Sequence, residues 1–125
     1  MERMVLTKED KTIRQILIDV ASKGSTITYT NLCSRAGLEL DMHNRQHASL
    51  LGDIIGDIST YEVEHGRPML SSVVLTKNGY EGNGFFRLAE ELFNFTINKQ
   101  DEKAFQNEMI KKTHNYWETH KDETD

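Results

Sequence analysis

The fold of this chain is decided by residues 66–86, GRPMLSSVVLTKNGYEGNGFF. Proline fixes its own φ and disfavours helix at the residue before it, so the opening Gly-Arg-Pro predicts that a preceding helix ends near His65. Residues 73–75 are apolar and rich in β-branched side chains, and the Asn78-Gly79 pair that follows is typical of a tight hairpin turn. The stretch therefore predicts a small β-hairpin, with Phe85-Phe86 returning the chain to the interior.

On both sides of this hairpin, apolar residues recur at the spacing of an α-helix. Thr7 and Asp10 form a plausible capping pair for a first helix, and Gly24 and Gly37 are placed to end the first two helices. The expected helices cover residues 7–23, 30–36, 85–94 and 101–120, with a short strand over residues 25–29. A third helix follows the polar linker 38–44 and carries the apolar stripe Leu50, Leu51, Ile54, Ile55 and Ile58.

Two further features of the third helix lead to predictions. Gly52 and Gly56 lie four residues apart inside it, which we interpret as close packing against another backbone. Ser59 and Thr60 are expected to restart a short helical turn that ends at His65.

Composition limits the classes of protein to consider. With 125 residues, 37% of them apolar, and a single proline, the chain predicts one folded domain. The start of the chain lacks a signal peptide, no apolar run is long enough to span a membrane, and Cys33 is the only cysteine, so we expect a cytoplasmic protein without membrane contact. The net charge of −5 excludes a globally basic nucleic-acid clamp but leaves room for a local basic face.

The order of elements predicts a mainly α fold with a small β-hairpin, a winged helix-turn-helix-like domain over residues 1–97. Residues 98–125 are expected to add a charged amphipathic helix and a frayed tail, KDETD. The apolar positions of that helix are Phe105, Met109, Ile110, Tyr116 and Trp117. They either dock on the domain or form a surface for a homodimer or another protein.

The sequence offers few candidates for chemistry. His43 and His47 have the spacing of metal ligands on a helix, but two ligands do not make a site, and we expect solvent-facing histidines and no metal or cofactor. We expect Ser71-Ser72 to make hydrogen bonds at the start of a strand and Cys33 to be a buried small hydrophobe. The acidic residues Glu62, Glu64, Glu90 and Glu91 are interpreted as solvated, so no catalytic pair is predicted. The turn at residues 82–86 remains an alternative site for an anion or a nucleotide.

Three segments resemble one known family, the alkyltransferase-like DNA-binding domain of the O6-alkylguanine-DNA alkyltransferases. ITYTNLCSRAG, residues 27–37, resembles the start of that domain, and RQHASLL, residues 45–51, is similar to its Arg-x-x-Gly/Ala-x-x-Leu recognition helix. Residues 68–74 resemble its proline, active-site and double-valine stretch. The resemblance covers residues 25–86, about half of the chain.

The resemblance implies roles for two residues and removes one activity. Tyr29 corresponds to the family's tyrosine near a phosphate, and Arg45 to the arginine that fills the gap left by a flipped base. Where the family has Pro-Cys-His-Arg, this chain has Pro-Met-Leu-Ser-Ser, so the alkyl acceptor is absent. Cys33 lies on a different helix and cannot replace it, which excludes methyl transfer.

We therefore expect a non-catalytic protein that binds DNA or RNA through the third helix and the hairpin. The predicted contact residues are Tyr29, Arg35, Asn44, Arg45, Ser49, Lys77 and Asn78. The alternative is a regulatory or protein-interaction module on the same scaffold, which the acidic total charge would suit. The sequence does not distinguish DNA from RNA, and it does not identify a pathway or a partner.

Overall fold

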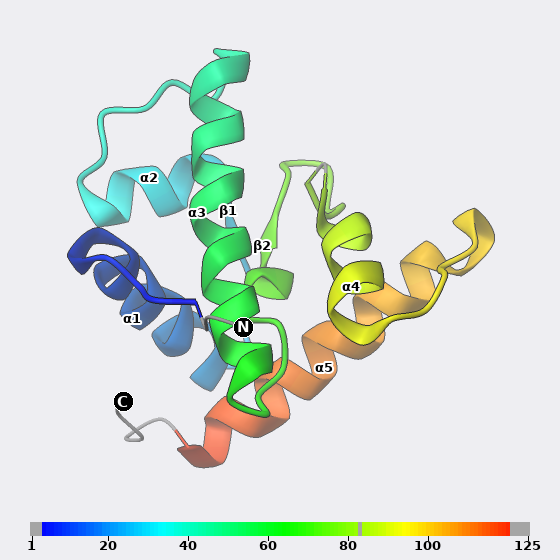
Figure 1. The fold of residues 1–125 in the computed structure, drawn as a ribbon. Coiled ribbons are helices and arrows are strands. Elements are labelled where there is room, and N and C mark those ends of the chain that lie inside the picture. The colour runs from blue at the N-terminus through cyan, green and yellow to red at the C-terminus, as the bar shows by residue number, and fades with distance from the viewer. Residues whose placement is uncertain (1–3, 83, 121–125) are drawn as a thin grey trace.

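The computed structural model describes residues 4–82 and 84–120 and is mainly helical, as predicted (Figure 1). Its longer helices are α1 (Lys8–Ser22), α2 (Tyr29–Ala36), α3 (Arg45–Glu64), α4 (Phe85–Phe93) and α5 (Glu102–His120). Single 3-10 turns, η1 (Leu70–Val73) and η2 (Lys99–Asp101), precede β2 and α5. The two strands are β1 (Ile27–Thr28) and β2 (Val74–Leu75).

Local capping explains where the first helices begin. Thr7 and Asp10 form a complete capping box, in which each side chain accepts the other residue's backbone N–H at 3.0 Å. The Thr28 hydroxyl caps α2 with a single hydrogen bond, accepting the N–H of Asn31. Gly37 ends α2 with φ of +71°, a conformation that favours glycine. These boundaries agree with the sequence to within one residue.

The predicted β-hairpin is wrong in its main pairing. β2 pairs in parallel with β1, with Ile27 opposite Val74, and Val73 belongs to the 3-10 turn η1 instead of the strand. The return limb of the expected hairpin reaches β2 through one antiparallel bridge, between Leu75 and Glu81. The turn itself is present, because Thr76 donates its N–H to the carbonyl of Tyr80 at 2.8 Å.

Helix α3 runs through the centre of the molecule, with α1 and α2 on one side and β2 and α4 on the other (Figure 1). It is continuous to Glu64, so the expected restart at Ser59 is wrong. Ser59 is fully buried and accepts the backbone N–H of Ser71 at 2.9 Å, which joins α3 to η1. In the predicted apolar stripe, Leu51, Ile55 and Ile58 are buried, whereas Leu50 is 49% exposed.

Helix α5 docks on the rest of the domain. It packs chiefly against α1, and Trp117 is completely buried in the same core cluster as Leu17 and Ile58. Its buried face differs from the predicted apolar stripe and includes polar side chains. The buried residues of α5 are Gln106, Met109, Thr113 and Trp117. The expected fraying of residues 121–125 lies outside the described residues.

A buried ion-pair network joins α1 to both ends of the turn after α3. Glu62, which we had interpreted as solvated, is fully buried and pairs with Arg14 Nε at 2.6 Å and with Arg67 Nε at 2.7 Å. Both guanidinium groups also lie over the Tyr61 ring. Buried charges require partners of this kind, because water no longer stabilises them.

None of the described helices combines the length and the apolar character that crossing a membrane would require.

A candidate binding cleft

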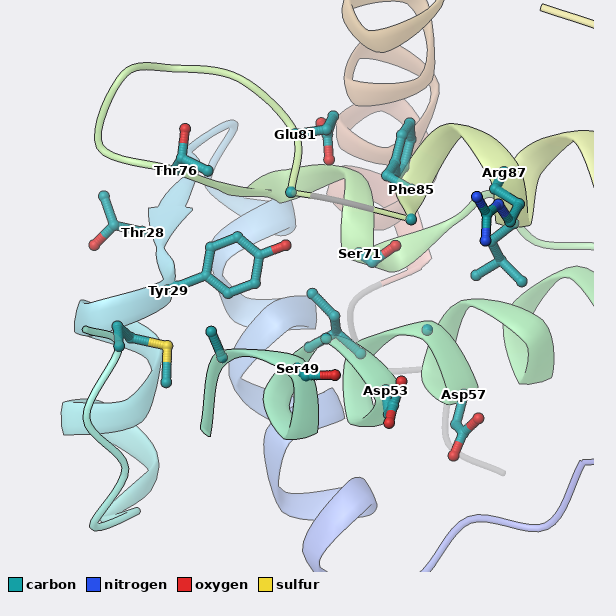
Figure 2. A pocket seen from close by; sticks show the side chains of 18 of the residues that line it. Thr28, Tyr29, Ser49, Asp53, Asp57, Ser71, Thr76, Glu81, Phe85 and Arg87 are labelled. Carbon is teal, nitrogen blue, oxygen red and sulfur yellow. The ribbon is translucent and has the colours of Figure 1, made fainter. Parts of the chain in front are cut away.

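A cleft of about 1290 Å³ opens beside α3. One wall is the face of α3 that carries Ser49, Asp53 and Asp57, and Figure 2 shows these side chains on successive turns. The opposite walls come from the β1–α2 junction, the turn over residues 76–82, and the first turns of α4. Segments far apart in the sequence therefore enclose one open space.

Two half-buried glycines of α3 line the cleft. Gly52 lines the cleft, and a methyl group placed on it would meet no atom within 4 Å beyond its chain neighbours and the nearby backbone of its own helix. At Gly56 a methyl group would meet only the Leu88 side chain, at an ordinary contact distance of 3.5 Å. The expected close packing against another backbone is therefore wrong at both glycines. Glycine within a helix costs roughly 0.5–1 kcal/mol relative to alanine, and at Gly52 its effect is to leave space in the cleft.

Tyr29 projects its phenol ring into the cleft wall (Figure 2). Burial, and secondarily the nearby Glu81, raises the pKa of Tyr29 to about 12, although a hydrogen bond from the Gly82 N–H acts in the opposite direction. A β-carbon on Gly82 would lie only 2.7 Å from Tyr29 Cζ. Glycine is thus required at this position for the phenol to occupy its place, and the hydroxyl stays protonated near neutral pH.

Charged groups of both signs line the cleft. The cations are Arg45 at the start of α3, Lys77 in the turn, and Arg87 on α4. The exposed carboxylates are Asp53 and Asp57 on α3 and Glu91 on α4, and all six of these residues are exposed. Across residues 4–82 and 84–120, none of the six takes part in a salt bridge or a side-chain hydrogen bond. Burial, together with Asp10 and Asp53, raises the pKa of Asp57.

Four of the seven predicted contact residues meet in this cleft. Tyr29, Arg45, Ser49 and Lys77 line it, although they come from three separate segments. The other three predicted residues, Arg35, Asn44 and Asn78, do not line it and are described next.

Arg35 lies on α2 outside the cleft lining. It pairs with Asp19 at 2.6 Å, which lowers the pKa of the Asp19 carboxyl. Asn44 uses its side-chain oxygen to cap α3, accepting the N–H groups of Gln46 and His47. Asn78 is exposed in the turn outside the cleft lining. These three side chains therefore lie apart from the four that line the cleft.

Sequence reasoning placed neither the carboxylates of the cleft nor Arg87 in the site. A signal for Asp53 and Asp57 was present, because Arg45, Ser49, Asp53 and Asp57 recur every four residues and so share one helix face. No comparable signal existed for Arg87, since the sequence does not show that α4 turns its start toward α3.

Hydrogen bonds join the turn over residues 76–82 to α5. Lys103 and Gln106 each donate a hydrogen bond to the Gly79 carbonyl at 3.0 Å, and the Glu81 N–H reaches Gln106 Oε1 at 3.3 Å. Lys103 also lies 4.6 Å from the centre of the Tyr80 ring. These contacts hold one wall of the cleft in place.

Glu81 is an unusual member of that wall. Its side chain is 9% exposed, and its Oε2 is buried without a hydrogen-bond partner among the described residues. Burial raises the pKa of Glu81 to about 9, with Lys103 opposing the shift. The carboxyl is therefore neutral near pH 7.

The other candidates for chemistry have structural roles. His47 accepts the backbone N–H of Asp41 at 2.9 Å. Ser71 and Ser72 are buried, and their hydroxyls bond Ser59 and Thr113. Cys33 is buried, which raises the pKa of its thiol. In the described parts of the chain, no three His, Cys, Asp or Glu side chains gather as a metal site would require.

No family model, curated protein or solved structure gave a significant match to the chain.

Proposed function

We propose that this protein binds nucleic acid without catalysis, through the cleft between α3 and the 76–82 turn, on a winged-helix arrangement. The observation that supports this most directly is the meeting of Tyr29, Arg45, Ser49 and Lys77 in one open cleft. The sequence alone predicts all four as contact residues. Arg87 adds a third cation to the same space.

The charges of the cleft suit a ligand that carries phosphates. Arg45, Lys77 and Arg87 are exposed and have no carboxylate partner within the described residues, so no protein contact has to break before they meet a phosphate. A net charge of −5 for the whole chain does not oppose this, because affinity for phosphates depends on where the cations lie. Ser49 and Thr76 supply neutral groups that can bond phosphate or sugar oxygens.

Two observations support a binding role without a chemical step. The segment that resembles the acceptor site of the alkyltransferases carries Ser71 and Ser72, whose hydroxyls are committed to buried hydrogen bonds. The Cys33 thiol is buried and its pKa is raised, which disfavours the reactive thiolate.

The test is fluorescence anisotropy with labelled single-stranded and duplex oligonucleotides over a range of salt concentrations. We expect binding at low salt that weakens steeply between about 50 mM and about 200 mM salt, because bound phosphates release counterions. The double variant Arg45→Ala/Lys77→Ala should bind more weakly and with a shallower salt dependence. Lys11→Ala/Lys111→Ala removes the same charge from exposed positions on α1 and α5 outside the cleft and serves as the matched control. No binding at low salt, or equal losses in both double variants, would refute the proposal.

A second candidate function, protein interaction, is supported by a separate apolar surface. Phe93 and Phe95 are 41% and 43% exposed and line a second cavity of about 710 Å³ with Phe105 of α5. Trp117, which belongs to the predicted apolar face of the C-terminal helix, is buried in the core. Light scattering of the full chain would test for a homodimer through this surface, and Phe93→Ser/Phe95→Ser should then return it to a monomer.

A further inference from the structure

Glu81 places a buried carboxyl group in the wall of the cleft. The residue lines the cleft and is 9% exposed, and its Oε2 is buried without a hydrogen-bond partner among the described residues. The carboxyl is close enough to the Tyr29 phenol to raise its pKa, and Figure 2 shows one carboxyl oxygen directed toward the space between Tyr29 and Phe85. A buried acceptor without a partner is costly, so it indicates a bonding group that the protein itself does not supply.

The polar neighbours of Glu81 are engaged with other groups. Lys103 is the cation whose charge acts on the Glu81 carboxyl, but its Nζ donates to the Gly79 carbonyl at 3.0 Å. Gln106 donates its side-chain N–H to the same carbonyl and accepts the backbone N–H of Glu81. The carboxyl therefore stays without a partner, although a cation and an amide lie close to it.

An organic cation is the kind of group that would complete this site. It brings N–H donors together with a positive charge, and a carboxylate bonds an ammonium or a guanidinium more strongly than it bonds neutral donors. The exposed charges of the cleft do not oppose a cation, because three basic side chains are offset by three acidic ones. These six residues are Arg45, Lys77, Arg87, Asp53, Asp57 and Glu91.

We propose that Glu81 and the neighbouring wall of the cleft form a binding site for an organic cation, an ammonium or guanidinium group of a small molecule or of a peptide side chain, which pairs with Glu81 as a carboxylate. The inference goes beyond the proposed function and does not depend on it. The carboxyl is neutral near pH 7 in the free protein and ionised in the pair, so binding releases its proton to the solvent.

The test is isothermal titration calorimetry with butylguanidinium and with butylurea, which has nearly the same shape and no charge. Guanidinium keeps its charge throughout the working pH range, so the ligand itself does not titrate. Near neutral pH we expect butylguanidinium to bind at least about tenfold more tightly than butylurea. Enthalpies measured in buffers of different ionisation enthalpy should show the release of about one proton.

The affinity for butylguanidinium should also increase as the pH rises from about 6 toward about 9, by at most about tenfold for each pH unit. His43 lines the cleft as well, and a histidine can change its charge in this range. Only the part of the pH dependence that Glu81→Gln removes is therefore assigned to Glu81.

Two variants of the same kind separate Glu81 from the exposed carboxylates. Glu81→Gln keeps the neutral shape of the side chain, so it should fold normally near neutral pH and lose both the preference for butylguanidinium and the proton release. Glu91→Gln removes an exposed carboxylate from the lining of the same cleft and should change the affinity by about twofold or less. Thermal unfolding of both variants checks that they are folded.

The peptide acetyl-Gly-Arg-Gly-amide distinguishes the source of the cation. Binding at least as tight as that of butylguanidinium assigns the site to a peptide side chain, and weaker binding assigns it to a small molecule. Equal affinities for butylguanidinium and butylurea, binding without proton release, or equal losses in Glu81→Gln and Glu91→Gln overturn the inference. None of these results bears on oligonucleotide binding, which the anisotropy titrations measure separately.

Discussion

The contact between Tyr29 and Gly82 shows how one missing side chain shapes the cleft. A β-carbon on Gly82 would lie 2.7 Å and 3.1 Å from two atoms of the Tyr29 ring, closer than side chains pack. We expect Gly82→Ala to destabilise the protein by about 1–3 kcal/mol, because the ring must move. In a Tyr29→Ala background the same change should cost almost nothing. Urea denaturation of the four proteins of this double-mutant cycle measures the difference, and equal costs in both backgrounds would contradict the contact.

The buried carboxyl of Glu81 predicts a particular dependence of stability on pH. Its pKa is raised to about 9 from 4.5, so between these values the folded chain holds a proton that the unfolded chain has lost. The stabilising effect of that proton is complete below about pH 4.5 and decreases as the pH rises toward about 9, by at most about 1.4 kcal/mol for each pH unit.

Glu81→Gln removes this ionisation and keeps the shape of the side chain. We therefore expect the free energy of unfolding of the variant to increase relative to that of the wild type as the pH rises from about 5 to about 9. Urea denaturation at each pH measures both. Parallel curves for the two proteins would show that Glu81 ionises normally in the folded chain. Glu91→Gln, an exposed change on α4, is the control.

At the scale of single elements, α3 combines good caps and a buried apolar stripe with an interior glycine that no packing contact requires. Gly52→Ala adds a methyl group that meets no atom within 4 Å beyond its chain neighbours and the nearby backbone of its own helix. We expect it to raise the stability of the protein by about 0.5–1 kcal/mol, because alanine restricts the unfolded chain and favours helix. The same methyl group narrows the cleft, so the affinity for oligonucleotides should fall. A loss of stability in thermal unfolding would mean that Gly52 has a packing role.

The helices and the places of the two short strands were largely predictable from the sequence, whereas the pairing of the strands was not. Caps such as Thr7 with Asp10 and terminators such as Gly37 act within a few residues, so local patterns determine where α1 and α2 begin and end. Asn78-Gly79 correctly indicated a turn. The main partner of β2 is β1, at residues 27–28, and a pairing between segments so distant in sequence leaves no local signal.

For the molecule as a whole, the Arg14–Glu62–Arg67 network is the strongest polar link between its parts. Glu62→Gln leaves two buried guanidinium groups without the carboxylate that balances them, so we expect a loss of about 3–5 kcal/mol in the free energy of unfolding. Glu91→Gln should change it by less than about 0.5 kcal/mol, because Glu91 is exposed. Chemical denaturation measures both, and a small effect at Glu62 would show that these charges are not buried in solution.

The candidate site was only partly predictable, because it depends on contacts between segments that are distant in sequence, as the strand pairing does. The resemblance pointed to Tyr29 and Arg45, and the expected contacts of the third helix and the hairpin pointed to Ser49 and Lys77. The sequence did not show which side chains are free to bind a ligand. Arg35 pairs with Asp19, and Asn44 caps its own helix. Glu62 pairs with Arg14, which is distant in sequence, and with Arg67, which lies beyond a turn. These pairings depend on the complete packing of the chain.

The double hydrogen bond from α5 to the Gly79 carbonyl has a kinetic consequence. Because the turn that carries Lys77 is already fixed, a ligand need not wait for a loop to close over it, and little conformational entropy is lost on capture. Association should then proceed in a single concentration-dependent phase, with its rate set by diffusion and electrostatic attraction.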